Sequence, residues 1–118
     1  MKRPHKYRAV PTEVDGIRFD SKREAAVYAQ LRLRERAGEI SGLELQPVFP
    51  LVIDGEPVRG LPAKNGRRGP PLSYTADFAY FDGQRRRVVD VKGMDTQLAR
   101  FKRAIVQHIY KVEIEVVR

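Results

Sequence analysis

Asp77, Asp90 and Lys92 are the residues of this chain whose types and spacing could do chemistry. In an extended strand, side chains two apart share a face, so Asp90 and Lys92 point one way while the valines beside Asp90 point toward a core. Facing carboxylates repel each other unless a cation lies between them, and their oxygens suit Mg²⁺ or Mn²⁺. The three side chains therefore predict a site for a divalent metal ion.

A β-hairpin should bring the two aspartates together. Residues 74–81 and 86–92 are rich in aromatic and β-branched residues and are separated by Asp82-Gly83, a strong hairpin signal. A two-residue loop would place Asp77 one diagonal step from Asp90, whereas a four-residue loop would place the two directly opposite. Either loop puts both acids on one face.

A simpler interpretation is that Asp90 and Lys92 are solvated residues on the polar face of an ordinary half-exposed sheet. Two features together favour a functional site instead. The pair lies at the end of a strand, beside a turn at Gly93 and the start of a helix, and cations that could bind phosphate surround it. Neither feature suffices alone.

Glu24 and Gln46 are further candidates. Glu24 lies on the apolar stripe of a helix that we expect over residues 21–37, ending at Gly38, so its carboxylate would face the sheet. Ser21 three residues earlier also makes a capping box, in which Glu24 only closes the helix start. Gln46 is an amide among apolar residues, and such a residue is more often simply an outward-facing strand position.

The composition indicates a partner rich in phosphate. The chain has 118 residues, and 23 Lys and Arg against 15 Asp and Glu give a formal net charge of +8. This balance is typical of nucleic-acid binding, with an anionic membrane surface as second choice. No run reaches the roughly 20 apolar residues of a membrane span, and the absence of cysteine excludes disulfides and thiolate zinc sites. We expect a soluble cytoplasmic protein with no membrane association.

The chain divides into a tail and one domain. Residues 1–12 are basic with little apolar spacing and predict a mobile arm, and residues 13–118 form the domain. Residues 56–72 are rich in proline, glycine and cations, which predicts a flexible basic loop. The residues that we expect to hold DNA are Lys6 and Arg8 in the arm, Lys64, Arg67 and Arg68 in the loop, and Arg100, Lys102 and Arg103 on a second helix.

The remaining elements complete the predicted fold, which has both helices and strands (α/β, of the α+β type) in the order αβββαβ. Residues 43–46 and 48–53 predict strand, interrupted by prolines and followed by an Asp54-Gly55 turn. Residues 112–116 alternate between apolar and charged types, as in a half-buried strand. The second helix begins at Asp95 or Thr96, and its apolar positions are Leu98, Phe101, Ile105 and Ile109.

The residues resemble the PD-(D/E)XK nuclease superfamily, and more narrowly its small phage-type endonucleases and Holliday-junction-resolvase-like members. The resemblance implies a restriction-endonuclease-like core, in which a mixed sheet of about four strands is flanked by two helices. Two departures stand out: Ala76 occupies the position of the proline, and the second acid is Asp90 instead of Glu. The matching segments are residues 12–17, 19–24, 45–47, 74–78 and 89–93.

The resemblance also implies a role for each site residue. Asp77 and Asp90, with the backbone carbonyl of Val91 and with Glu24, would hold Mg²⁺ or Mn²⁺ against the scissile phosphate of DNA. Lys92 would orient the attacking water, and Gln46 would position Lys92 or the nucleophile. One active site per chain means that cutting both strands, or resolving a junction, requires a homodimer. A phage or prophage role in DNA recombination or packaging would follow.

Two rival interpretations belong to other classes. A non-catalytic nucleic-acid-binding module could keep the fold and the charge, and it would bind without Mg²⁺. Against it, all the acidic and lysine positions of the resemblance are filled here. A structural protein that binds an acidic partner has only the net charge in its favour.

Overall fold

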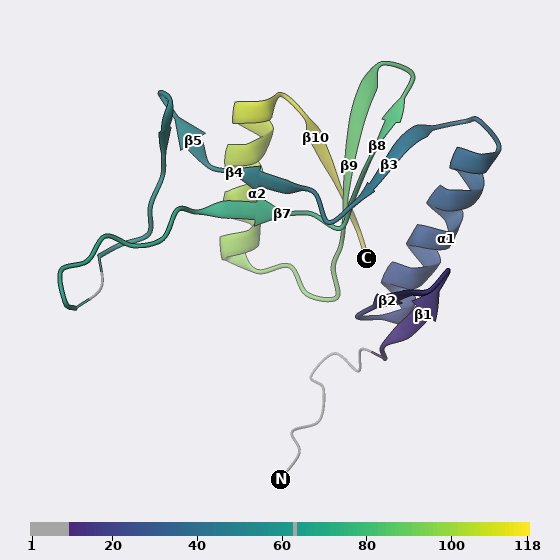
Figure 1. Ribbon diagram of the computed structural model, residues 1–118, viewed down its shortest axis with the longest axis horizontal. Coiled ribbons are helices and arrows are strands. Elements are labelled where there is room, and N and C mark those ends of the chain that lie inside the picture. The colour runs from purple at the N-terminus through teal and green to yellow at the C-terminus, as the bar shows by residue number, and fades with distance from the viewer. Residues whose placement is uncertain (1–9, 63) are drawn as a thin grey trace, which may run out of the picture.

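The computed structural model describes residues 10–62 and 64–118 and shows a mixed α+β fold. Its central sheet has four strands in the order β3–β8–β9–β10, and the helices α1 and α2 lie on either side of this sheet (Figure 1). The three strands β3, β8 and β9 are antiparallel, and β10 runs parallel to β9. The bounds are α1 (Lys22–Arg36), β3 (Ser41–Leu45), β8 (Phe78–Asp82), β9 (Arg85–Val91), α2 (Gln97–Tyr110) and β10 (Glu113–Val117).

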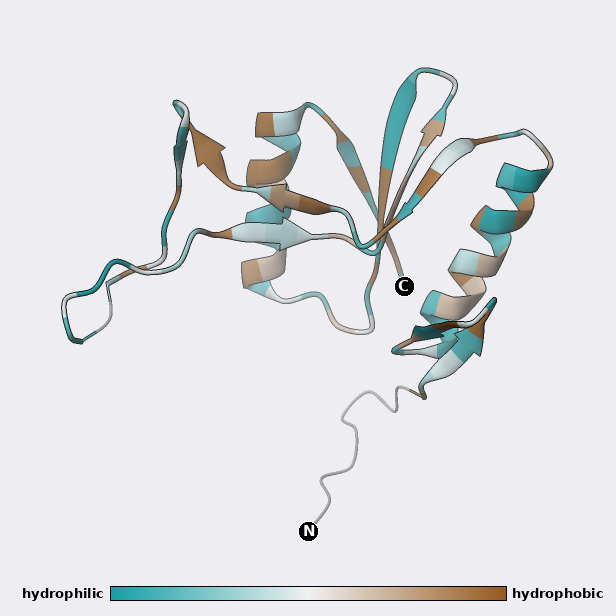
Figure 2. Ribbon diagram, viewed as in Figure 1, coloured by the Kyte–Doolittle hydropathy of each residue, from teal (hydrophilic) through white to brown (hydrophobic). Residues whose placement is uncertain are grey.

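Alternation along β8 and β9 divides the core into two clusters. Phe78, Tyr80 and Val89 pack under α1, whereas Ala79 and Val88 pack under α2. Because successive strand residues point to opposite faces, both faces of this hairpin are apolar where the helices cover them. Figure 2 shows the change along β9, whose first half is hydrophilic and whose second half is apolar.

The hairpin between β8 and β9 sets the position of the two aspartates. Its loop is Gly83-Gln84, one residue later than predicted, and the φ of Gly83 is +64°, which glycine adopts without strain. The paired residues end at Phe78 and Val89, and the N–H of Asp77, just before β8, donates to the Val89 carbonyl at 3.2 Å. Asp77 therefore lies outside the regular ladder, next to the strand that carries Asp90.

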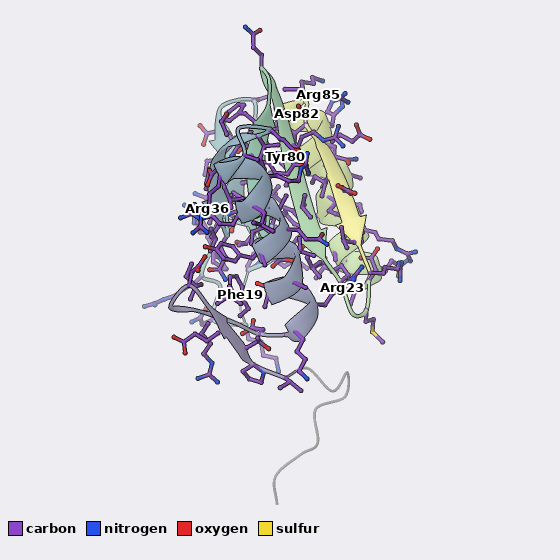
Figure 3. The ribbon with its side chains drawn as sticks, turned by 90° about the vertical axis from the view of Figure 1, so that its right-hand side faces the viewer. Phe19, Arg23, Arg36, Tyr80, Asp82 and Arg85 are labelled. Carbon is purple, nitrogen blue, oxygen red and sulfur yellow. The ribbon has the colours of Figure 1, made fainter. Side chains whose placement is uncertain are left out.

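The ends of α1 agree with the sequence analysis. The Ser21 hydroxyl accepts a hydrogen bond from the Glu24 backbone N–H at 3.1 Å and caps the helix. The helix ends before Gly38, whose φ is +78°. Tyr80 lies between this helix and the sheet, and Phe19 lies near the first turn of α1 (Figure 3).

A short hairpin precedes α1 and was not predicted. Strands β1 (Thr12–Val14) and β2 (Ile17–Phe19) are joined by Asp15-Gly16, whose φ angles of 54° and 75° suit a type I′ turn. The Tyr28 hydroxyl donates a hydrogen bond to Asp15 at 3.1 Å and ties the hairpin to α1. Most of the predicted arm, with Lys6 and Arg8, lies outside the described residues.

Residues 48–57 and 73–75 carry the chain away from the main sheet as a ribbon (Figure 1). Strand β4 (Val48–Pro50) pairs with β7 (Ser73–Thr75). Strands β5 (Val52–Ile53) and β6 (Glu56–Pro57) form a hairpin at the predicted Asp54-Gly55 turn, where both φ angles are positive.

The segment predicted as a flexible basic loop, residues 56–72, forms an arm with a hydrogen-bonded base. Arg59 and Pro71 form a β-bridge, and the Gly60 N–H donates to the Pro70 carbonyl at 3.0 Å. The two chains of the arm approach so closely that a Cβ on Gly69 would lie 2.3 Å from the Gly60 carbonyl oxygen. Only glycine fits at Gly69.

Helix α2 forms as predicted, with Thr96 as its cap, but it buries a different face. Leu98 and Phe101 are 64% and 65% exposed, whereas Val106 is fully buried. Arg103 is also buried, at 7% exposure. The apolar spacing therefore identified the helix correctly and its packed side wrongly, because the packed side is decided by what the sheet and β7 present to it.

In residues 10–62 and 64–118, no helix is long and apolar enough to cross a membrane.

The same substitution at two phenylalanines tests this assignment of buried and exposed faces. Phe78 has 0% exposure, so Phe78→Ala should lower the free energy of unfolding by about 3–5 kcal/mol. Phe101→Ala on the exposed face of α2 should change it by only about 0.5 kcal/mol. Urea unfolding monitored by circular dichroism measures both. Equal losses for the two variants would show that the outer face of α2 is covered.

Candidate active site

The site lies where one long antiparallel ladder bends. The register of β3 with β8 and that of β4 with β7 are continuous through Gln46-Pro47 and Ala76-Asp77. The Gln46 N–H donates to the Asp77 carbonyl at 2.9 Å, and the Ala76 N–H donates to the Pro47 carbonyl at 3.1 Å. The backbone turns at Gln46, whose φ is 51°. Because of the bend, β8 begins only at Phe78, and Asp77 lies half-buried just before it.

Asp77 and Asp90 are held by several hydrogen bonds and ion pairs. Asp77 Oδ2 accepts a hydrogen bond from the Val91 N–H at 2.7 Å. Asp90 is 2% exposed, and its Oδ2 lies 3.1 Å from Lys92 Nζ. The same oxygen accepts a hydrogen bond from the Tyr74 hydroxyl. The structure therefore brings the two predicted acids and the predicted lysine into one cluster.

Negative charge in this cluster is incompletely compensated. Burial, followed by hydrogen bonding to Asp90 and repulsion from Asp90 and Glu24, raises the pKa of Asp77 to about 7, although the Val91 N–H opposes this rise. Burial and the charges of Asp20 and Asp90 raise the pKa of Glu24 as well. Two acids that hold their protons more tightly than usual mark a place where an added cation would be stabilised.

Glu24, in the first turn of α1, is close enough to this cluster for its charge to act on Asp77 and Asp90, and the helix cap uses the Ser21 hydroxyl and the Glu24 N–H but not the Glu24 carboxylate. The second half of a capping box would be a bond from the Ser21 N–H to the Glu24 carboxylate, and no such bond occurs among the described residues. The half-buried carboxylate is therefore not engaged by the helix end.

The donor set fits a magnesium ion better than a closed protein cage. Within the residues that the structure describes, no three His, Asp or Glu side chains lie close enough to form such a cage. Mg²⁺ is commonly held by one or two carboxylates, with water and substrate phosphate completing its shell. Asp77 and Asp90 supply two carboxylates, and the Val91 carbonyl and Glu24 are the further candidate ligands.

Gln46 is beside the site through its backbone, but its side chain is exposed and makes no hydrogen bond in the described part of the chain.

Lys64, Arg67 and Arg68 lie exposed toward the tip of the arm, and Arg100 is exposed on α2. Lys102 is half-buried, and its Nζ donates to the Ser73 carbonyl at 3.3 Å.

Arg103 was predicted to bind DNA, and the structure contradicts this. Its guanidinium Nη2 lies 2.5 Å from Asp95 Oδ2, and the two side chains are only 9% and 8% exposed. An arginine engaged in this way cannot reach a phosphate without leaving its partner. The charge count alone could not distinguish a buried pair from a surface cation.

Tyr74 is the site residue that sequence reasoning missed. Alternation along a strand predicts only on which face of the sheet Tyr74 lies. Its contact with Asp90 joins two residues that are 16 positions apart in the sequence. A tyrosine three residues before the first acid is the only local signal.

Residues 4–117 match the model of a family described as "Protein of unknown function (DUF1064)". No curated protein and no solved structure matches the chain.

The raised pKa of Asp77 predicts a fold that loses stability as pH rises. Its ordinary value of 3.8 becomes about 7 in the folded chain, so the folded state binds the proton more tightly across that range. The free energy of unfolding should therefore fall as pH rises from about 4 to about 8. Asp77→Asn should remove part of this dependence and raise Tm at pH 8.

Thermal melts of wild type and Asp77→Asn between pH 4 and 8 measure the effect, with the exposed Asp82→Asn as a matched control. Parallel curves for wild type and Asp77→Asn would contradict the assignment, since the lost stability would then belong to other groups.

Proposed function

We propose that this chain, which belongs to the DUF1064 family of proteins of unknown function, is a metal-dependent endonuclease that hydrolyses phosphodiester bonds in DNA. The observation that carries this proposal is the cluster of Asp77, Asp90 and Lys92 at the bend of the ladder, in which the two acids are neighbours and Lys92 is paired with Asp90. The order α1, β3, β8, β9, α2, β10 is also the order expected of a restriction-endonuclease-like core.

Each residue of the cluster has a distinct task in such a reaction. Asp77 and Asp90 would hold Mg²⁺ or Mn²⁺, together with the Val91 carbonyl, and Glu24 would add negative charge nearby without completing a cage of three acids. When bound, the ion would stabilise charge on the phosphoryl oxygens and lower the pKa of a coordinated water. Lys92, whose side chain is 24% exposed, retains a route to solvent and would orient the nucleophilic water.

Asp90 and Lys92 also hold a negative and a positive charge, respectively, at fixed positions before the substrate binds. The buried acid is fixed by hydrogen bonds, so little rearrangement is needed when charge develops on the phosphate. Gln46 would reach the nucleophile from the bend only after its exposed side chain rotates inward.

The substrate class follows from the charge outside the cluster. Lys64, Arg67 and Arg68 on the arm, with Arg100 and Lys102 on α2, would hold the phosphate backbone. Such contacts give affinity with little sequence information, which favours cleavage directed by DNA shape, as at a four-way junction. Cutting both strands would use two copies of the chain. The protein would then act in the cytoplasm of a bacterial or phage-infected cell.

Cleavage of a labelled four-way junction and of matched linear duplex tests the proposal. With Mg²⁺ or Mn²⁺, wild type should cut, and Asp77→Asn and Lys92→Met should each lower the rate by at least about 100-fold. EDTA should abolish cutting, and Asp82→Asn should cut like wild type. Tight binding of wild type without cutting in either metal would identify a non-catalytic DNA-binding module instead.

The role in DNA binding of the arm formed by residues 56–72 can be tested separately from cleavage. Replacing Lys64, Arg67 and Arg68 together by alanine should weaken DNA binding and reduce the slope of log K against log salt by up to about 3. Arg85→Ala is the control, because this arginine lies at the far hairpin and pairs with Glu113. Fluorescence anisotropy over a salt series measures the slope. An unchanged slope would remove the arm from the DNA interface.

A further inference from the structure

A buried ion pair lies behind the active site and takes no part in the chemistry proposed above. Asp95, between β9 and α2, and Arg103 on α2 are both more than nine-tenths buried, with Arg103 Nη2 at 2.5 Å from Asp95 Oδ2. The hydrogen bond from Arg103 lowers the pKa of Asp95. Burying such a pair adds little net stability, because the loss of hydration offsets the attraction. A role in the arrangement of neighbouring groups would explain why it is there.

Tyr74 connects this pair to the site. Its ring is 4% exposed, and its hydroxyl donates to Asp90 Oδ2. Burial and the bond to Asp90 raise the pKa of Tyr74, and the neighbouring Arg103 opposes that rise. A phenol keeps its proton at neutral pH, so the hydroxyl is the donor in this bond. Arg103 interacts with the tyrosine on one side and with Asp95 on the other.

The effect of Tyr74 on Asp90 depends on which carboxylate oxygen of Asp90 accepts its hydrogen bond. Tyr74 and Lys92 both contact Oδ2 of Asp90. Two donors on one oxygen fix the rotation of the carboxylate about its Cβ–Cγ bond. The second oxygen is then presented in a constant orientation for a ligand.

We infer that Tyr74 is a positioning residue, which fixes the Asp90 carboxylate so that Oδ1 binds a divalent cation, and that the Asp95–Arg103 pair holds Tyr74 in place. This inference rests on the proposed function, since it assumes that Asp90 is a metal ligand. Partners that orient a metal-binding group commonly change affinity by about 10- to 100-fold when removed. The start of α2 is thereby coupled to the metal site.

The test measures Mn²⁺ binding by the full chain without DNA, using isothermal titration calorimetry. Tyr74→Phe should raise the Kd about 10- to 100-fold, and Asp90→Asn should raise it further. Tyr80→Phe is the matched control, because Tyr80 is equally buried but faces α1. Arg103→Gln should weaken binding, and Arg103→Lys should recover part of the loss.

The outcomes separate this inference from the function on which it rests. If wild type binds no Mn²⁺, the proposed function fails. If wild type binds and Tyr74→Phe binds equally well, only the positioning role fails. Equal weakening by Tyr74→Phe and Tyr80→Phe would indicate a general loss of packing and would also overturn it.

In cleavage assays, Tyr74→Phe should need about 10- to 100-fold more Mg²⁺ for half-maximal rate, with the KM for DNA unchanged. Saturating Mg²⁺ should restore kcat. A variant that is merely less folded would lose kcat without recovery, and Arg103→Gln supplies an independent variant if Tyr74→Phe proves unstable.

Discussion

The antiparallel ladder between residues 41–50 and 73–82 is the constraint on which the rest of the structure depends. Its register shifts once between Ser41 and Glu44 and is continuous from there to Pro50, yet the backbone bends at Gln46 and Asp77, so the chain leaves the sheet beside the site. Without the bend, Asp77 would be an interior position of a longer strand, covered on both faces. With it, the acid keeps a bond to the Val91 N–H and also an open side. The same bend sends β4 and β7 outward to carry the arm.

The stability of the site comes from its surroundings more than from its own groups. Asp90, on the same face of β9 as Val88, and its neighbour Asp77 are carboxylates whose burial is unfavourable to folding, and Lys92 and Tyr74 compensate only Asp90. Packing of Val88 and Val106 on the same side supplies apolar burial that the acids cannot. Such a balance is usual where function requires charges that folding alone would not retain.

Local signals predicted the elements well, and contacts between distant segments explain the rest. Turn residues and caps located the hairpin, both helices and the alternating strand β10, because these depend on neighbours in sequence. The packed side of α2, the burial of Arg103 and the contact of Tyr74 depend on which strands lie beneath the helix. Spacing identified Asp77, Asp90 and Lys92 as a group, but only the structure showed that Asp77 leaves the ladder and accepts a hydrogen bond from the Val91 N–H.

Strand β10 is synthesised after the residues of the site, so the site and its supporting strand form one after the other. The Lys92 N–H donates to the Val117 carbonyl at 2.8 Å, and Val116 pairs with Asp90, so the strand that carries the acid and the lysine is supported on one edge by residues made later. At typical elongation rates, the 25 positions from Lys92 to Val117 take about one to five seconds. A nascent chain therefore contains the acidic pair before it contains the strand that supports it, and the site is completed only after β10 has left the ribosome.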